Sequence, residues 1–473
     1  MKHGGTKLLS RTQTASGQRL NRRSSKRGTC TMELTAGHVW VMVAAALVLF
    51  MTPGLAFFYG GMTRAKAALN MMMMSFISIG IVGVVWVLWG ASMSSGEGFL
   101  QIVGNPFATF GLEGIDTPDG LIKVGYASTF AIITVALISG AIADRAKFGA
   151  WSIFVPVWVT LVYCPLAYMV WGGGLFGPEG AIGKALGPAI DFAGGTVVHI
   201  NAGVAALVLV LIIGNRRGFG KDPNHRPHNI PFVMLGAAIL WFGWFGFNGG
   251  AATTAEQGGL IWINTLAAPA AAMIGWLITE RIRDGHPTSL GAASGVVAGL
   301  VAITPACANV SPIGALGLGV VAGVASALAV GLKFRWGFDD SLDVVGVHLV
   351  SGIIGTVALG FIALPTDGVG GGLFYGGGMA QMWAQLAAAG IAIAFSAIMT
   401  AIIAFAIHKT MGFRVSTEQE NVGVDLSLHA ETAYEFGVNG HGGSFQPLHE
   451  AMTGKSDPAA AKTPAEGKES VQA

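Results

Sequence analysis

Two histidines stand inside apolar stretches of this chain, where an ionisable side chain is costly. His199 lies in DFAGGTVVHINAG, residues 191–203, and His348 lies in DVVGVHLVSG, residues 343–352. Ionisable residues within membrane-spanning segments are rare and usually line a pathway. A neutral imidazole offers one hydrogen-bond donor and one acceptor. We therefore predict that the two histidines line a pathway; a pair of interhelical hydrogen bonds is the alternative.

Asp191 precedes His199 near the start of its apolar stretch. The amino end of a helix favours an anion, so Asp191 is either a structural cap or a group that attracts cations, and we favour the cap. The second histidine stretch opens with Asp343, and a glycine follows each histidine by four positions, at Gly203 and Gly352. The spacing from aspartate to histidine differs between the two stretches. Their likeness still favours an internal repeat of helices in opposite orientation.

The elements that must position these residues are apolar helices. The 473 residues are 52% hydrophobic and 11% charged, whereas soluble domains carry about 25% charged residues. A helix needs roughly 20 apolar residues to cross a membrane. We predict an all-α polytopic membrane protein with eleven transmembrane helices, an inverted repeat of five plus five and a final helix. The predicted spans are 37–61, 68–93, 121–143, 150–172, 189–214, 229–249, 257–279, 289–306, 312–332, 343–364 and 382–408.

Positive charge predicts the orientation, since Lys and Arg concentrate in cytoplasmic loops. The loops after odd-numbered spans hold nearly all of the loop Lys and Arg, and the other side offers only Lys123 and Lys184. We therefore expect a cytoplasmic C-terminus and, with eleven spans, an outer N-terminus. The predicted domains are an N-terminal extension at 1–36, the eleven-helix domain at 37–409, a cytoplasmic regulatory tail at 410–450 and a disordered C-terminus at 451–473.

The N-terminal extension disagrees with this orientation. Residues 1–31 carry eight Lys and Arg and no acidic residue, yet they are expected outside. They contain no apolar run and are not a cleavable signal peptide as they stand. We interpret the extension as a mis-assigned start, with Met32 as the alternative first residue; a genuine basic extension is the other interpretation.

Aromatic residues gather at three predicted outer ends of spans. They are YASTF at 126–130, Trp171 in MVWGGG, and WFGWFGFNGG at 241–250. Aromatic faces can hold a small cation by cation–π attraction, and rings can plug a narrow pore. The alternative is the ordinary aromatic belt at the membrane surface.

The enzyme and metal-binding motifs that the sequence resembles are incomplete. HEAMT at 449–453 lacks the second His of HExxH, and PEGAIGKA at 178–185 lacks the first Gly and the Ser or Thr of a P-loop. Cys30, Cys164 and Cys307 form no CxxC pair, which argues against a disulfide framework or a zinc site. We expect no enzyme, no cofactor and no metal.

Seven motifs together resemble the Amt/Mep/Rh ammonium transporters, most closely the bacterial Amt branch. Spread over about residues 38–435, they are LVLFMTPGLAFFYGG, MVWGGG, DFAGGTVVHINAG, WFGWFGFN, LVAITPACA, DVVGVHLVSGIIG and GVDLSLHAETAY. The resemblance implies a homotrimer in the bacterial inner membrane, in contact with lipid. Ammonium is gathered at an outer vestibule and loses its proton, and ammonia crosses a hydrophobic pore with net charge transfer. The resemblance also admits a PII-type signalling protein as a partner at the cytoplasmic face.

The resemblance further implies roles for single residues at the outer end. Trp171 matches the cation–π wall of the recruitment site, and Tyr126 matches another vestibule aromatic. Phe130 matches the ring that is both wall and outer gate, with Phe247 stacked beneath it. Ala251 stands where a serine that contacts ammonium is common in the family, so we predict weaker recruitment.

Inside the pore, His199 and His348 match the twin histidines that share a hydrogen bond, and Asp191 matches an aspartate needed for activity. Thr253 or Thr254 is a candidate to replace the missing serine hydroxyl of the recruitment site. In the tail, HAE at 429–431 stands where HGE is usual, which makes regulation by a PII-type protein less secure.

Two alternatives share the membrane fold. The first is an Rh-like channel for neutral gas, against which Trp171 and the aromatic vestibule argue, because a neutral gas needs no cation site. The second is an ammonium sensor, and the polar tail is expected to be too short for the added signalling domain of such sensors.

Overall fold

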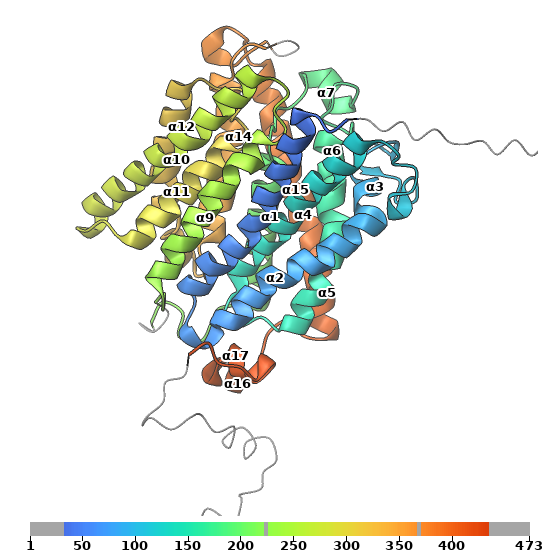
Figure 1. The fold of residues 1–473 in the computed structure, drawn as a ribbon. Coiled ribbons are helices and arrows are strands. Elements are labelled where there is room, and N and C mark those ends of the chain that lie inside the picture. Colours follow the sequence, from blue (N-terminus) through green and yellow to red (C-terminus); the bar gives the residue numbers. More distant parts are fainter. Residues whose placement is uncertain (1–32, 222–225, 367–369, 435–473) are drawn as a thin grey trace, which may run out of the picture. The chain divides into compact units, whose positions relative to one another are not determined.

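The computed structural model describes residues 33–221, 226–366 and 370–434. Residues 1–35 form a unit of their own, and the helices belong to the second unit, Ala36–Ala473 (Figure 1). Most of the predicted N-terminal extension, the alternative start at Met32, the last part of the regulatory tail and the predicted disordered C-terminus lie outside the described residues.

Five spans make up the first half of the helical unit. The first is α1 (Ala36–Met62), and the second consists of η1 (Ala65–Ala67), α2 (Ala68–Val85), η2 (Trp86–Gly90) and α3 (Ala91–Met93). The third is α4 (Pro118–Ser139) with η4 (Gly140–Ile142), and the fourth is α5 (Phe148–Trp158), η5 (Val159–Tyr163) and α6 (Cys164–Trp171). The fifth is η6 (Gly195–Ile200) with α8 (Asn201–Ile213).

Six spans follow. They are α9 (Ile230–Gly249), α10 (Ala255–Asp284), α11 (Ser289–Ile303), α12 (Pro312–Ala329) with α13 (Leu332–Trp336), η7 (Val345–Leu349) with α14 (Val350–Ile362), and α15 (Ala380–Thr410). The smaller elements are an antiparallel pair β1 (Gly98–Phe99) and β2 (Val103–Gly104), η3 (Phe110–Leu112), α7 (Ala181–Leu186), η8 (Leu373–Tyr375), α16 (Thr417–Val422) and α17 (Val424–His429).

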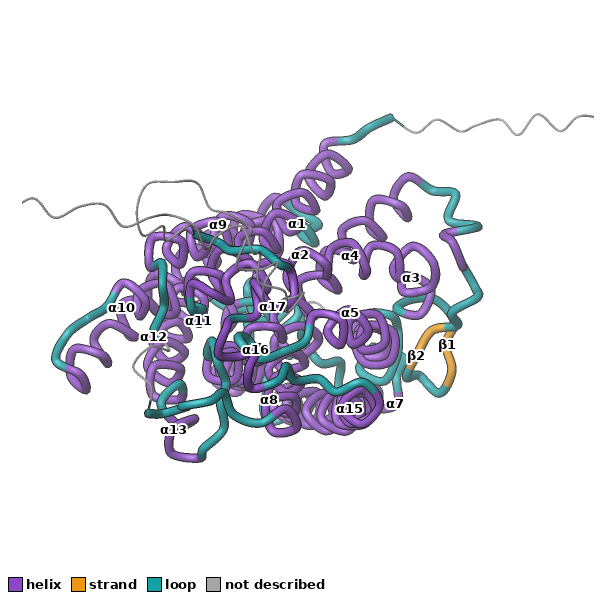
Figure 2. Tube along the Cα trace, turned by 90° about the horizontal axis from the view of Figure 1, so that it is seen from below, coloured by secondary structure: helices purple, strands orange, loops and turns teal. Residues whose placement is uncertain are grey.

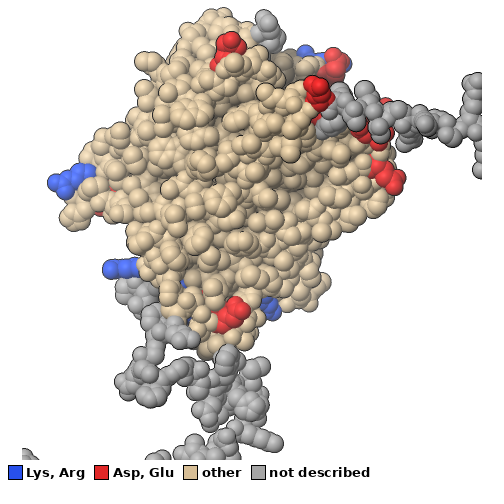
Figure 3. Space-filling model, viewed as in Figure 1, with Lys and Arg blue, Asp and Glu red and all other residues tan. Residues whose placement is uncertain are grey.

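The described residues contain ten helices that are long and apolar enough to cross a membrane, together with the shorter apolar helix α11. The eleven predicted spans are therefore all helical, and the all-α fold class is confirmed. The starts of the spans lie within three residues of the predicted positions except for the fifth, which begins at Gly195 rather than 189. An aspartate and irregular backbone precede the helix there, as described below. Figure 3 shows charged residues at the margins of an uncharged band.

Side-chain caps explain where many spans begin. A Ser, Thr or Asn accepts a hydrogen bond from the backbone N–H three residues later, which satisfies a donor that the helix leaves free. These caps are Thr117 before α4, Asn229 before α9, Thr254 before α10, Thr288 before α11 and Ser311 before α12. Proline in the first turn of α4, α9 and α12 costs no hydrogen bond there.

Glycine lets the spans approach closely, which accounts for much of the high glycine content. A Cβ on Gly236 of α9 would lie 2.3 Å from the backbone nitrogen of Phe58 in α1. Cβ atoms on Gly319 and Gly323 of α12 would lie 2.2 and 2.1 Å from carbonyl oxygens of α10. In lipid, the hydrophobic effect does not drive helices together. Small residues at such crossings let the helices approach closely, so that van der Waals packing stabilises their association.

Buried ion pairs tie the loops together on the side where α16 and α17 lie across the helix ends (Figure 2). Arg216 binds Asp144 and both carboxylate oxygens of Asp339 at 2.8 Å. Arg145, which is fully buried, donates to the backbone oxygen of Asp339 at 2.6 Å. Burial opposes ionisation of Asp339, but the guanidinium groups of Arg216 and Arg145 outweigh it and lower the pKa to about 2.

Candidate functional site

His199 and His348 meet inside the helical unit. His199 in η6 and His348 in η7 bring their Nδ1 atoms to 3.3 Å, and the rings lie nearly parallel, with centroids 5.4 Å apart. One Nδ1 must donate and the other accept. Both side chains are buried, and Nε2 of His199 has no hydrogen-bond partner within the described part of the chain. The pair therefore presents an unused imidazole nitrogen to a small apolar cavity.

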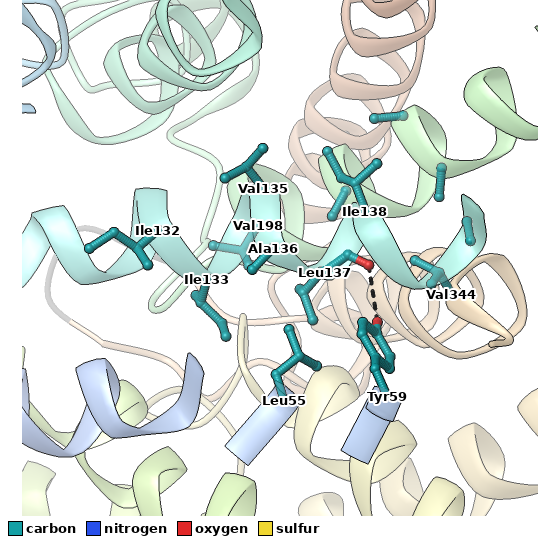
Figure 4. Close-up of a cluster of buried hydrophobic side chains, with 14 of the residues drawn as sticks. Leu55, Tyr59, Ile132, Ile133, Val135, Ala136, Leu137, Ile138, Val198 and Val344 are labelled. Carbon is teal, nitrogen blue, oxygen red and sulfur yellow. Dashed lines mark hydrogen bonds between the residues drawn. The ribbon is translucent and has the colours of Figure 1, made fainter. Parts of the chain in front are cut away.

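That cavity is narrow, with a volume of ≈ 10 Å³, which is about the space for one water molecule. Apart from the histidines its walls are apolar. The lining residues are Met51, Leu55, Phe58, Ile133, Leu137, His199, Leu240, Trp244, Phe247, Val297 and His348. Figure 4 shows Leu55, Ile133 and Leu137 from two different helices pointing toward one another. Such a wall can hydrogen-bond a small molecule only at the imidazoles.

Two glycines let the histidine segments cross. A Cβ on Gly203 would lie 2.6 Å from the backbone nitrogen of Leu349, the residue after His348. Reciprocally, a Cβ on Gly352 would lie 3.2 Å from the backbone nitrogen of Ile200, the residue after His199. The glycine four positions after each histidine is therefore the place where the opposite segment packs. This reciprocal contact is what an inverted repeat produces.

Stacked aromatic rings lie beside the histidine pair. Phe130 and Phe247 stack with centroids 4.2 Å apart at an angle of 24°, and Phe247 lies 6.1 Å from the ring of His199. Their side chains are only 5% and 1% exposed, so the two rings together fill the space next to the imidazoles. The indole of Trp244 stacks on His199 from another side, with centroids 5.5 Å apart. Trp244 was not singled out from the sequence as a neighbour of His199.

Further aromatic residues continue outward from this stack. Trp171 meets Phe130 edge-on with centroids 6.1 Å apart, and Tyr126 meets Phe130 at 4.9 Å. The hydroxyl of Tyr126 donates to the backbone oxygen of Phe247 at 2.7 Å. Trp171 is 40% exposed, whereas Phe130 is buried. The structure thus brings all four predicted aromatic residues together, from an exposed ring to a closed stack.

Asp191 lies at the start of the histidine segment rather than among the aromatic rings. Its carboxylate accepts hydrogen bonds from the backbone nitrogens of Gly194, Gly195, Thr196 and Val197, and from the hydroxyl of Thr196. These donors satisfy the free amino end of η6. Asp191 therefore forms a structural cap, whose charge is enclosed by the segment that carries His199.

Ala251 lies two residues after the end of α9 at Gly249. Ala251 is exposed, and its neighbour Gly250 packs against the ring of Tyr126, because a Cβ there would lie 2.5 Å from that ring. The hydroxyl of Thr253 contacts Gln257 at 3.2 Å, and the hydroxyl of Thr254 accepts from the backbone nitrogen of Gln257. Both threonine hydroxyls are therefore engaged at the start of α10.

The tail docks on the first turn of α2. Asp425 accepts hydrogen bonds from the backbone nitrogens of Leu69 and Asn70, and His429 contacts the amide of Asn70 at 2.9 Å. Ala430, the second residue of HAE, has φ 53 and ψ 33. This left-handed conformation favours glycine, which gives a physical reason for the glycine usual in the family at this position.

The fold and the site together define a class of protein: a polytopic helical membrane protein that encloses a narrow, apolar cavity lined by two histidines. A family model, the Ammonium Transporter Family, matches residues 39–434. The chain belongs to this family and is an ammonium transporter.

Similar proteins agree with this assignment. The chain is 53% identical over 431 residues to an ammonium transporter of Mycobacterium tuberculosis strain H37Rv, covering 84% of this chain and 90% of the relative. The crystal structure of Candida albicans Mep2 is similar with a TM-score of 0.74 and 31% identity, over 81% of this chain and 87% of that one. A structure described as a sensor Amt protein is similar with a TM-score of 0.76 and 27% identity, over 83% and 97%.

Proposed function

We propose that this protein gathers ammonium at its outer aromatic vestibule, removes a proton, and conducts ammonia past the histidine pair into the cytoplasm with net transfer of charge. One observation carries the proposal: two buried imidazoles, 3.3 Å apart at Nδ1, are the polar groups of an otherwise apolar cavity. An apolar cavity of this size disfavours a hydrated ion, and a neutral amine needs only one or two hydrogen bonds.

Recruitment takes place at the exposed aromatic residues. The face of Trp171 attracts the cation, and Tyr126 and Phe130 complete the wall around it. A cation held by ring faces is bound more weakly than one held by a carboxylate, so it can be released toward the pore. Ala251 offers no hydroxyl to this site, and the threonine hydroxyls nearby are engaged with Gln257. Recruitment is therefore weaker than with a serine at position 251.

The gate is the stacked pair Phe130 and Phe247. Because both rings are buried and touch, one of them must turn to admit a molecule to the histidines. Inside the gate, His199 and His348 hydrogen-bond the amine and relay its proton along the shared Nδ1 contact. Asp191 holds the first turn of η6 and thereby positions His199; a contribution to cation attraction is secondary.

The orientation and assembly belong to the same proposal. The protein lies in the bacterial inner membrane with its N-terminus outside and its C-terminus in the cytoplasm, because the arginine-rich loops lie on the side of α16 and α17. Residues 37–409 form the transport domain of a homotrimer, in contact with lipid. The tail from residue 410 is regulatory, and a PII-type protein binds at this face.

The test is a transient current. Purified protein is reconstituted in liposomes and exposed to a pulse of ammonium, beside His199→Ala, His348→Ala and protein-free liposomes. We expect a saturable inward positive current in the wild type that either substitution abolishes or alters. Ammonia equilibration without current would favour a neutral gas channel instead. Saturable binding of ammonium without current or equilibration would favour a sensor, for which the likeness to a sensor Amt protein is the supporting observation.

A further inference from the structure

The segment that carries His348 is capped by Asp340, not by Asp343, the aspartate with which the stretch opens. The carboxylate of Asp340 accepts hydrogen bonds from the backbone nitrogens of Val344 at 3.1 Å and Val345 at 2.7 Å, where η7 begins. Asp343 instead binds the ammonium group of Lys333 at 2.6 Å, and its own backbone is left-handed, with φ 63. The sequence-based pairing of Asp343 with Asp191 is therefore wrong.

Asp340, unlike Asp343, has the same spacing to its histidine as Asp191. It stands eight residues before His348, as Asp191 stands eight residues before His199. In η6 and in η7 alike, the histidine is the next-to-last residue of a π-helical segment. Two aspartates at the same distance from two histidines, on helices of opposite direction, are the expected product of an inverted repeat.

The two aspartates are also anchored in equivalent ways. The indole N–H of Trp171, at the end of the fourth span, donates to the backbone oxygen of Asp191 at 2.7 Å. The ammonium group of Lys333, at the end of the ninth span, donates to the backbone oxygen of Asp340 at 2.9 Å. Spans four and nine are equivalent in a repeat of five, so one donor serves each cap at each end of the pore.

The loop around Asp340 is held on both sides. Arg145 donates to the backbone oxygen of Asp339 and to the hydroxyl of Ser341, each at 2.6 Å, and the backbone nitrogen of Ser341 donates to Ala141 at 3.2 Å. On the helix side, Val344 is packed in the buried cluster of Figure 4. The carboxylate between these contacts is therefore fixed relative to the first turn of η7.

The two caps differ in strength. Asp191 accepts five hydrogen bonds, whereas Asp340 accepts two. Burial raises the pKa of Asp340 to about 6, against the attraction of Lys333 and with added repulsion from Asp343. Among the described residues, Lys333 and Asp343 are the charged groups with the largest effect on Asp340, Arg145 contacts the residues on either side of it, and the phenol of Tyr59 lies within its electrostatic reach. A protonated carboxyl is the weaker acceptor, so this cap loosens as the pH falls.

We propose that Asp340 is a positioning residue for His348: its carboxylate fixes the segment at the cytoplasmic end of the pore as Asp191 fixes the segment at the outer end, and conduction past the histidine pair requires it. Asp340 does not touch the transported molecule. It acts through the register of η7, which sets the contact between the two imidazoles. The inference rests on the proposed transport function and adds a residue to it.

The test compares Asp340→Ala, Asp340→Asn and the matched control Asp343→Asn in the full-length protein, by ammonium-evoked current in liposomes from pH 5 to 7.5. Loss of a cap should lower the Asp340→Ala current by about tenfold or more. The wild-type current should fall as the pH drops through about 6, and Asp340→Asn should lose this inflection. Asp343→Asn should keep the inflection at a lower pH, because it removes a repelling charge. Nitrogen NMR of labelled histidine should show the imidazole contact weakened only in the Asp340 variants.

A wild-type current and an unchanged histidine spectrum in Asp340→Ala would overturn the inference while leaving the transport proposal intact. Absence of current in the wild type would instead overturn the transport proposal, and the spectrum would then decide on the cap alone. Asp340→Asn keeps one acceptor oxygen and nearly the same volume. If the alanine variant does not assemble, the pH profile and the histidine spectrum of Asp340→Asn therefore test the role of the Asp340 carboxylate. An inflection retained in Asp340→Asn would assign the pH dependence to another group.

Discussion

The indole of Trp171 is fixed by Asp191: its N–H donates to the backbone oxygen of that residue at 2.7 Å, while 40% of the side chain stays exposed. One residue thus combines a free aromatic face at the vestibule with a hydrogen bond to the cap of the histidine segment. Trp171 is therefore linked to the histidine segment by this hydrogen bond as well as by its ring contact with Phe130, and substitution can separate the role of the N–H from the role of the ring.

We expect Trp171→Leu to raise the half-saturating ammonium concentration by about 5- to 30-fold, since a cation–π contact is worth about 1–2 kcal/mol. Trp171→Phe keeps an aromatic face but loses the N–H, so it should shift the concentration less and reduce the maximal current more. Currents recorded over a range of ammonium concentrations measure both. Trp383→Leu, at an exposed tryptophan of α15, is the control. Equal concentration dependence in Trp171→Leu and wild type would remove Trp171 from the recruitment site.

Ala251→Ser should lower the half-saturating ammonium concentration by about 2- to 10-fold, because a neutral hydroxyl acceptor contributes about 0.5–1.5 kcal/mol. The maximal current should not change, since the substitution leaves the histidine pair untouched. Ala252→Ser, one position further along the same turn, is the matched control and should have no effect. If Ala251→Ser brings no gain in apparent affinity, the missing hydroxyl does not limit recruitment.

Asp339→Asn should destabilise the protein by about 2–3 kcal/mol, because it leaves the buried Arg216 with one partner fewer. The pKa of Asp339 is lowered from 3.8 to about 2, so its stabilisation is present above pH 3.8 and is lost as the pH falls toward 2. Thermal unfolding in detergent should show this loss in the wild type.

Asp339→Asn has no carboxylate to protonate and should lose less stability over the same pH interval. The exposed Asp116→Asn controls for the change of one charge. A variant that unfolds at the wild-type temperature, with the wild-type pH dependence, would show that the guanidinium groups are satisfied without Asp339.

Ala430→Gly should strengthen the docking of the tail by about 1 kcal/mol, because the left-handed conformation of residue 430 costs an alanine about 1–2 kcal/mol and a glycine little. Hydrogen exchange of the α17 amides should slow by about fivefold, since 1 kcal/mol corresponds to that factor. Ala433→Gly, at an ordinary backbone angle, should speed exchange or leave it unchanged. Faster exchange in Ala430→Gly would mean that the flexibility of free glycine outweighs the strain.

Much of this protein could be predicted from its sequence. A long apolar run predicts a membrane helix without any knowledge of tertiary contacts. The reason is that, in a membrane, the backbone groups of such a run must form their hydrogen bonds within the same helix. The eleven helices and the membrane class were therefore correct, and the seven motifs together indicated the family that the comparison shows. The start of the fifth span was wrong because apolar residues flank Asp191 in the irregular backbone that precedes η6.

Other features were decided only by the tertiary structure. The sequence determined which residues are ionisable, aromatic or small, and the period and length of the helices. From the sequence, Asp343 was matched with Asp191 and Asp340 was not singled out, although Asp340 has the same eight-residue spacing to its histidine as Asp191. The choice depends on which carboxylate reaches the free N–H groups of η7 and which is drawn to Lys333. The stacking of Trp244 on His199 is likewise set by packing between helices distant in the chain, because side-chain contacts across spans depend on crossing geometry and not on spacing.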